Sequence, residues 1–186
     1  MSTTKNKVKF NIKNCYYAKK TETGFSAPVA LPGAVSLTLE QQGELEAFYA
    51  DGVKYYVSSS NGGYEGDLEI ALITDEFRKD ILGEIEDANG VLIENADAET
   101  SEFAFGFQID GDQIPTLFWF YNCTATRPSI SSQTNEATKK PQTDSVTLSC
   151  SADDKGIVRA KTTPASYATV AATWFTEVYE VQESEG

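Results

Sequence analysis

The chain has 186 residues, which suits one domain or two small ones. Apolar residues make up 40% and charged residues 23%, a globular composition that excludes a disordered or membrane-embedded chain. Acidic residues outnumber basic ones 28 to 15, for a net charge of −13, and histidine is absent. The lack of imidazole excludes the Ser-His-Asp and Cys-His arrangements of nucleophilic catalysis.

Charge is distributed unevenly along the chain. The first 20 residues carry six lysines and no acid, whereas the rest carries nine cations and 28 acids, a net charge of −19. A body this acidic lacks the cationic surface that a DNA-binding protein needs. We therefore expect a basic N-terminal arm over residues 1–13 that docks on an acidic surface of another copy; the alternative is an exposed tail that maintains solubility. The charges of this arm are Lys5, Lys7, Lys9 and Lys13.

Four stretches alternate apolar and polar residues with a period of two, the pattern of strands with one buried face. They cover residues 34–40, 67–73, 102–109 and 145–150. A fifth stretch, TLFWFYNC at 116–123, is apolar at consecutive positions, which predicts a central strand or one covered by another subunit. Turn signals containing glycine separate the strands at 50–52, 89–90 and 110–112.

The segment 41–51, which follows the first of these strands, is acidic and polar apart from Leu45, Phe48 and Tyr49. An arm with a few exposed apolar residues needs a surface on which to dock. The pattern therefore predicts a long hairpin arm over about residues 40–51. The alternative is that Phe48 and Tyr49 simply begin the next strand.

Two short helices are expected. Thr74 is a suitable N-cap for a helix over 75–82, with Gly83 after its last turn. Apolar residues at helical spacing predict a second helix over about 166–179. Together with nine or ten strands, these helices predict a single mainly-β domain over 1–186, an antiparallel β-sandwich or small barrel with two short flanking helices.

No pattern in the chain points to catalysis. Cys15, Cys123 and Cys150 are odd in number and lack metal-ligand spacing, so we expect them to be reduced and buried. Acidic pairs such as Asp153-Asp154 are interpreted as solvated loops, and the aromatic run 118–121 as core rather than a carbohydrate-stacking platform. We expect no enzyme activity, no cofactor and no metal.

Several blocks of the sequence, in their joint order, resemble the major tail proteins of long-tailed, non-contractile phages and prophages of Gram-positive bacteria. Residues 84–117 match that family less distinctly. The blocks are NCYYAKK (14–20), GFSAPVALPGAVSLTLE (24–40), FYADGVKYYVSSSNGGYEGDLEIALITDEFRKDILG (48–83), YNCTATRPSISSQTNEATKKPQTDSVTLS (121–149) and WFTEVYE (174–180).

The resemblance implies a tail tube subunit, in which a β-sandwich with a flanking helix assembles as a hexameric ring around an inner β-barrel. Rings in that family stack through a long hairpin loop and a chain terminus, and the tube conducts genomic DNA during ejection. The implied partners are other copies of the chain and the tape measure, tail terminator and distal tail proteins, with DNA only as passing cargo. The implied location is the tail of the virion, assembled in the host cytoplasm without a membrane; no apolar run approaches the ~18–20 residues that cross a bilayer.

The resemblance also suggests roles for two groups of residues. The inter-ring arm, which we expect to be splayed or disordered in the free monomer, contains Gln41, Gln42, Gly43, Glu44, Leu45, Glu46, Ala47, Phe48 and Tyr49. The candidates for a face that lines the channel are Ser36, Thr38, Glu40, Asp67 and Glu69; the alternative is that this face meets solvent outside the tube. Two other function classes stay open: a monomeric β-sandwich module that binds carbohydrate and, less favoured, a carboxylate-dependent hydrolase.

Overall fold

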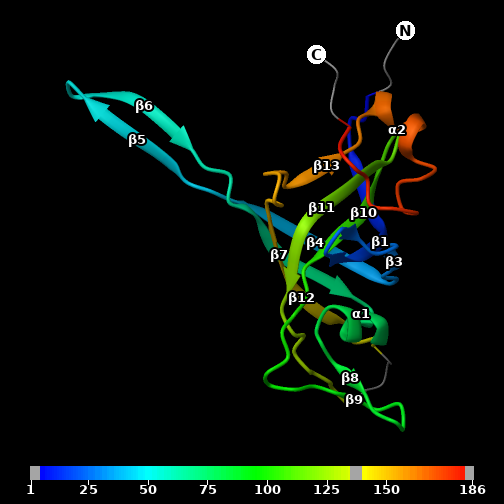
Figure 1. Ribbon diagram of the computed structural model, residues 1–186. Coiled ribbons are helices and arrows are strands. Elements are labelled where there is room, and N and C mark those ends of the chain that lie inside the picture. Colours follow the sequence, from blue (N-terminus) through cyan, green and yellow to red (C-terminus); the bar gives the residue numbers. More distant parts are fainter. Residues whose placement is uncertain (1–4, 135–139, 183–186) are drawn as a thin grey trace.

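The computed structural model describes residues 5–134 and 140–182, which form a mainly antiparallel β-structure with two short helices, as the sequence predicts (Figure 1). The main sheet has the strand order β2-β1-β10-β11-β12-β7-β4, with β3 beside β1 and β13 beside β11. Its strands are β1 Lys9–Thr21, β2 Gly24–Phe25, β3 Val29–Ala30, β4 Ala34–Gln42, β7 Gly63–Ile70, β10 Phe103–Gly111, β11 Thr116–Ala125, β12 Asp144–Ser151 and β13 Arg159–Lys161.

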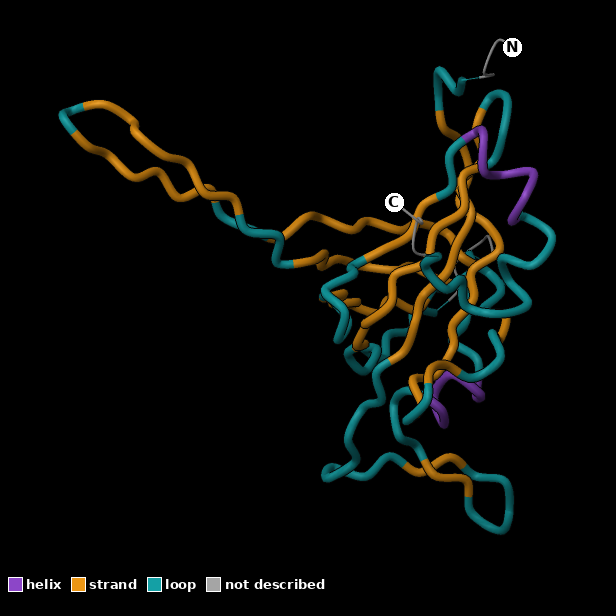
Figure 2. Tube along the Cα trace, turned by 45° about the horizontal axis from the view of Figure 1, so that its top comes forward, coloured by secondary structure: helices purple, strands orange, loops and turns teal. Residues whose placement is uncertain are grey.

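Two separate hairpins complete the β-structure. One joins β5 (Leu45–Ala50) to β6 (Val53–Ser59) and extends far from the body, as Figures 1 and 2 both show. The other joins β8 (Ile85–Glu86) to β9 (Leu92–Ile93) at the end of the body opposite the helix α2 (Pro164–Val170) (Figure 1).

The main sheet curves so that its two sides approach each other. The consecutive strands β3 and β4 pair with β1 and β7, which lie near opposite sides of the sheet. The short link between β3 and β4 is held to both: Leu31 N donates to Cys15 O at 2.8 Å, and Ala71 N donates to Gly33 O at 2.8 Å. The sheet therefore wraps around one apolar core, in the manner of a small barrel.

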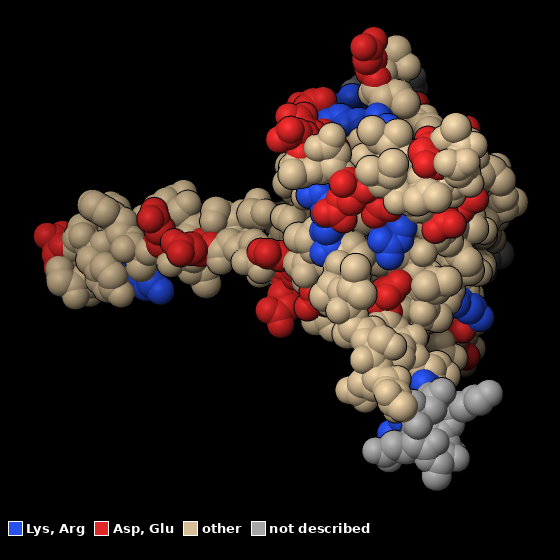
Figure 3. Space-filling model, turned by 90° about the horizontal axis from the view of Figure 1, so that it is seen from below, with Lys and Arg blue, Asp and Glu red and all other residues tan. Residues whose placement is uncertain are grey.

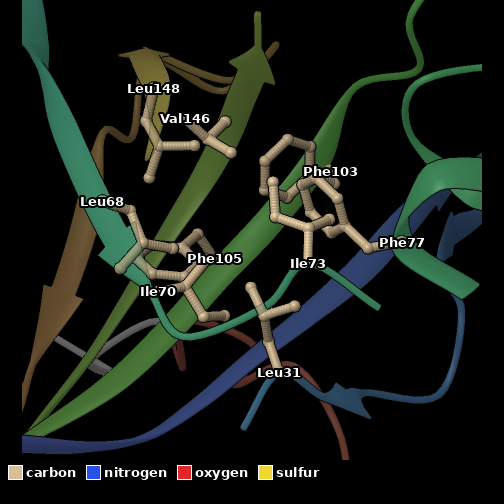
Figure 4. Close-up of a pocket in the computed structure, with 9 residues that line it drawn as sticks. All are labelled: Leu31, Leu68, Ile70, Ile73, Phe77, Phe103, Phe105, Val146 and Leu148. Atoms are coloured by element: carbon tan, nitrogen blue, oxygen red, sulfur yellow. The ribbon is translucent and has the colours of Figure 1, made fainter. Parts of the chain in front are cut away.

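The main core fills the inside of this curved sheet. Phe103 and Phe105 from β10 are fully buried there, and α1 (Asp75–Asp80) covers one end with Phe77. A cavity of about 10 Å³ remains in this core. Figure 4 shows that only apolar side chains line it, so it offers no polar group to a ligand.

A second core lies on the other side of β10 and β11, under α2 and the C-terminal segment. Trp119 is fully buried, and its indole N–H donates to Trp174 O at 2.8 Å. The Tyr121 hydroxyl donates to Tyr179 O at 2.8 Å. Both faces of β11 are therefore covered within one subunit, which explains its apolar run without a partner chain.

The first helix begins where the sequence predicts. The Thr74 side chain accepts from Phe77 N at 3.3 Å, which makes Thr74 the N-cap of α1. The helix predicted over about 166–179 begins two residues earlier, at Pro164, where Thr163 and Ser166 form a capping box. Its predicted end is wrong, because α2 ends at Val170. Beyond α2 the chain forms turns, in which the Thr176 hydroxyl bonds to Thr173 O at 2.8 Å.

Alternation over 34–40 and 67–73 places Val35 and Leu72 on the buried faces of their strands, but both are exposed. Val35 is 52% exposed, because the β4–β7 register shifts between Ala34 and Ser36 and moves Val35 out of the alternation. Leu72 is 69% exposed, because β7 ends at Ile70 and the chain then turns toward α1. The strand itself starts at Gly63, four residues before the predicted 67.

Candidate functional site

The β5–β6 hairpin, which we call the arm, leaves the body as a two-stranded ribbon (Figures 1 and 2). Its strands meet in the predicted turn, where Asp51 and Gly52 both have positive φ, 52° and 73°, as a two-residue hairpin loop requires. The sequence placed the arm at about 40–51. The structure keeps Gln41 and Gln42 in β4, opposite Tyr64 and Gly63, and makes β6 the second half of the arm.

The arm exposes apolar side chains on both of its faces. Phe48 lies opposite Tyr56 in the hairpin register, and Ala47 lies opposite Val57 on the other face. Phe48 is 62% exposed and Tyr55 is 72% exposed. A two-stranded ribbon without a core is marginal in water, so these side chains need a surface to cover them. The other large exposed residues of the arm are Leu45, Tyr49, Val53, Tyr56 and Val57.

Backbone hydrogen bonds hold the base of the arm. Gly62 N donates to Gln42 O at 2.7 Å, and Ser60 N donates to Glu44 O at 3.1 Å. Gly43 has φ of 155°, and a Cβ there would collide with the Ser60 carbonyl oxygen. Among the residues predicted for the arm, Gly43 and Glu44 therefore form its junction with the body, and Leu45, Glu46, Ala47, Phe48 and Tyr49 lie in β5.

The five candidates for a channel face lie together on one face of the sheet. Ser36 is the register partner of Glu69, Thr38 is the partner of Asp67, and Glu40 is the partner of Glu65. On the other side of β7, Ser145, Thr147 and Ser149 of β12 are the register partners of Glu69, Asp67 and Glu65. We call this surface the acidic face; its residues are Ser36, Thr38, Glu40, Glu65, Asp67, Glu69, Ser145, Thr147 and Ser149.

Hydroxyl groups, not cations, contact Glu69 and Asp67, two of the four carboxylates of the acidic face. The Ser36 hydroxyl donates to Glu69 at 3.0 Å, and the Thr143 hydroxyl donates to the other oxygen of Glu69 at 2.8 Å. Within the described part of the chain, the ion pairs involve other acids. The face therefore presents uncompensated negative charge. Figure 3 shows further acidic side chains along the arm and near its junction with the body.

The sequence reasoning missed Glu65 and the three β12 residues of this face. Ser145, Thr147 and Ser149 do alternate with apolar residues in the sequence, but nothing local shows that β12 lies beside β7. Glu65 was missed because the predicted strand began two residues after it. The alternation over 63–70 extends through Glu65 and could have been used to find it.

The predicted N-terminal arm is tied to its own subunit. Lys9 and Lys13 lie in β1, and Lys13 pairs with Asp110 at 2.7 Å. Lys7 N donates to the Asp112 carboxylate at 2.8 Å. These contacts lower the pKa of both carboxyl groups: the hydrogen bond from Lys13 is the main cause at Asp110, and the backbone N–H of Lys7 is the main cause at Asp112.

The free part of that arm is therefore shorter than expected, because strand pairing with β10 fixes residues 9–13. Lys5 is exposed at the start of the described chain, next to Asn6. The Asn6 side chain donates to Ile114 O at 2.6 Å and accepts from Ile114 N at 2.9 Å. Residues 1–4 of the predicted arm lie outside the described residues.

The structure places the aromatic run 118–121 in the two cores, as expected. Trp119 is fully buried, and Phe120 and Tyr121 are 3% and 4% exposed. A cleft of about 840 Å³ lies beside them, between the 20–27 hairpin and the C-terminal segment. Two of its aromatic residues, Trp174 and Tyr179, stack on each other with centroids 4.9 Å apart. Trp119, Phe120 and Tyr121 are too deeply buried to offer an open aromatic platform for a sugar ring.

No known family model matches the chain, and no curated protein matches it significantly. Among the described residues, three or more histidine, cysteine or acidic side chains nowhere gather in a way that would hold a metal ion. The helices described are all too short or too polar to cross a membrane.

Proposed function

We propose that this protein is a structural subunit of a phage tail tube, which assembles as stacked rings of identical copies around a channel for DNA. The observation that carries the proposal is the arm, a ribbon with apolar side chains on both faces and no core of its own. Such a ribbon is unfavourable in an isolated subunit and favourable between subunits.

The edge strand β4 also supports assembly. Among the described residues, β7 is the only strand hydrogen-bonded to β4, so the other side of β4 offers unpaired backbone groups. An exposed strand edge is a natural place for another chain to pair. The arm continues directly from β4, so one neighbouring copy can engage both features.

The acidic face suits the wall of a DNA channel. Basic residues on the wall would bind the phosphates of DNA and release its counterions, and this gain would make DNA adhere to the wall. The acidic face carries Glu40, Glu65, Asp67 and Glu69 among hydroxyl groups. A wall of this kind repels phosphate, so DNA can slide past it. We assign the acidic face to the channel, and its alternative place is the outer surface of the tube.

The test is assembly of the purified full chain, followed by sedimentation and negative-stain microscopy over a range of protein concentrations. The arm variant carries Phe48→Ser and Tyr55→Ser, and the matched control carries Leu72→Ser, which alters an equally exposed apolar residue outside the arm. We expect rings or tubes from the natural chain and the control, and monomers from the arm variant. A natural chain that stays monomeric at every concentration, or an arm variant that assembles as well as the control, contradicts the proposal.

A further inference from the structure

Two of the three cysteines face each other across neighbouring strands. Cys123 on β11 is the register partner of Cys150 on β12, and their Sγ atoms lie 2.7 Å apart. Both are buried in the main core, with 0% and 1% exposure. All three cysteines are free thiols in the structure.

The backbone at this pair already has the geometry of a disulfide. Residues directly opposite in an antiparallel pair have Cα atoms about 4.5–5.5 Å apart, and their side chains point to the same face of the sheet. Disulfides span Cα separations of about 4.4–6.8 Å. Cys123 and Cys150 can therefore be joined without moving β11 relative to β12.

The third cysteine is out of reach. Cys15 lies on β1, and β10 separates β1 from β11 in the sheet. Two strand spacings amount to about 10 Å, more than the ~7 Å limit for Cα atoms joined by a disulfide. Cys15 is also buried, and burial raises its pKa to about 12. It therefore serves as an internal control: a buried thiol without a partner.

We propose that Cys123 and Cys150 form a disulfide-competent pair, which hydrogen peroxide slowly converts into a disulfide that links β11 to β12. In the first step one thiolate attacks a peroxide oxygen, the O–O bond breaks, and a sulfenic acid and water form once a proton is taken up. In the second step the other thiol attacks the sulfenic sulfur, the S–O bond breaks and a second water leaves. The two sulfurs lose two electrons in total, and the peroxide accepts them.

Burial sets the conditions under which this reaction proceeds. The pKa of Cys123 is raised well above its usual range, first by burial and then by the hydrogen bond with Cys150. Thiolate is the reactive form, so the folded protein oxidises slowly and the pair stays reduced in a reducing cytosol. Peroxide is small enough to reach the sulfurs during local openings of the sheet.

The test treats the purified, fully reduced chain with hydrogen peroxide, then measures its mass and counts alkylatable thiols after unfolding. Apart from oxygen gained at the single methionine, we expect the mass to fall by about 2 Da, as two thiol hydrogens are lost, and the thiols to fall from three to one. Peptide mapping should show Cys123 joined to Cys150, with Cys15 alkylated. Treatment with a thiol reductant should restore all three thiols.

Variants make the assignment specific. Cys15→Ala keeps the pair and should lose about 2 Da as the natural chain does, whereas Cys150→Ala should not form an internal disulfide. If Cys150→Ala fails to fold, the peptide map of the natural chain decides the matter alone. A disulfide that involves Cys15, stepwise gains of oxygen on Cys123 or Cys150 that the reductant does not reverse, or three free thiols after complete peroxide treatment would overturn the proposal.

Discussion

The Thr147 hydroxyl on β12 donates to the Asp67 carboxylate on β7 at 2.7 Å, across the acidic face. This contact joins two residues 80 positions apart in the chain. It satisfies one carboxylate oxygen without neutralising its charge, because a hydroxyl group is a neutral donor. The sheet can thus keep several acids side by side, which a surface paired with lysine or arginine would not present.

Like charges meet directly at one position of the acidic face. Glu40 and Glu65 are register partners on β4 and β7, and both are exposed. Like charges directly opposite are destabilising, and opposite charges there stabilise by about 0.2–1 kcal/mol. We expect Glu65→Lys to raise the free energy of unfolding in urea at low salt, with the gain shrinking as salt rises. Glu65→Gln should raise the free energy of unfolding by a smaller amount, because it removes the repulsion without adding an attraction. Equal effects of lysine and glutamine would show that residue 65 does not interact electrostatically with Glu40.

Charge reversal on the acidic face tests its place in the tube. With Glu40→Lys and Glu69→Lys, tubes should still form, but DNA should leave particles built from them more slowly, above all at low salt, because cations hold phosphates. Glu22→Lys together with Glu177→Lys is a control for added positive charge elsewhere. Normal ejection at low salt from tubes that demonstrably form would place the face outside.

The N-terminal segment should respond to acid. A carboxyl group with a lowered native pKa stabilises the fold above its unfolded pKa of about 4, and this contribution is lost as the pH falls through the native pKa. Asp110 and Asp112 both have lowered pKa values. We therefore expect the amides of Lys7 and Val8, which donate to Asp112, to lose protection below about pH 4 once intrinsic exchange is corrected for.

The matched variant for that measurement is Asp112→Asn, which keeps the shape of the side chain and removes its charge. In this variant the two amides should already be less protected at neutral pH, and the loss on acidification should be smaller. The β12 amides, two strands away from β10 in the sheet, serve as the reference. A variant whose profile follows that of the natural chain would mean that the carboxylate does not hold the segment.

Gly106 on β10 makes room for an indole ring. Gly106 is the register partner of Trp119, and a Cβ at Gly106 would lie 2.7–2.8 Å from three ring atoms of Trp119. Trp119 is fully buried and cannot move aside freely. We expect Gly106→Ala to lower the free energy of unfolding by about 1–3 kcal/mol, the usual cost of overpacking.

The double variant Gly106→Ala with Trp119→Phe tests the cause. Phenylalanine lacks the outer indole atoms that the new methyl group would meet, so the alanine should cost less in the Trp119→Phe background. Urea unfolding of the four chains gives this coupling directly. Additive losses would mean that the methyl group clashes elsewhere.

Hydrogen exchange should distinguish the arm from the body. In the monomer, amides of β5 and β6 should exchange far faster than those of β10 and β11, because the arm has few buried contacts. In assembled tubes the arm amides should become protected, since a neighbouring copy would cover them. Equal protection of the arm in both states would rule out a role in assembly.

Much of this protein is determined by its sequence alone. A period of two is a local property of a chain, and it located β4, β12 and most of β7 together with their polar faces. It also located β10, but the face predicted to be polar is buried in the second core, as Ala104 shows. The apolar run at 116–123 located β11. Thr74 could be predicted as a helix N-cap because capping depends on residues three positions apart. The grouping of Ser36, Thr38 and Glu40 on one face follows from the same alternation.

Tertiary structure alone decided which faces meet. The acidic face exists because β7 pairs with both β4 and β12, and such pairing joins residues too distant in sequence for any local pattern to reveal. The same holds for Lys13, whose predicted partner was another subunit and whose observed partner is Asp110 in its own chain. The arm is separate from the main sheet because, among the described strands, β6 pairs only with β5. The sequence of 53–58 does not reveal this, because its pattern is compatible both with an arm and with a strand of the main sheet. Alternation determines on which face of a strand each side chain lies, whereas long-range packing determines which strands pair.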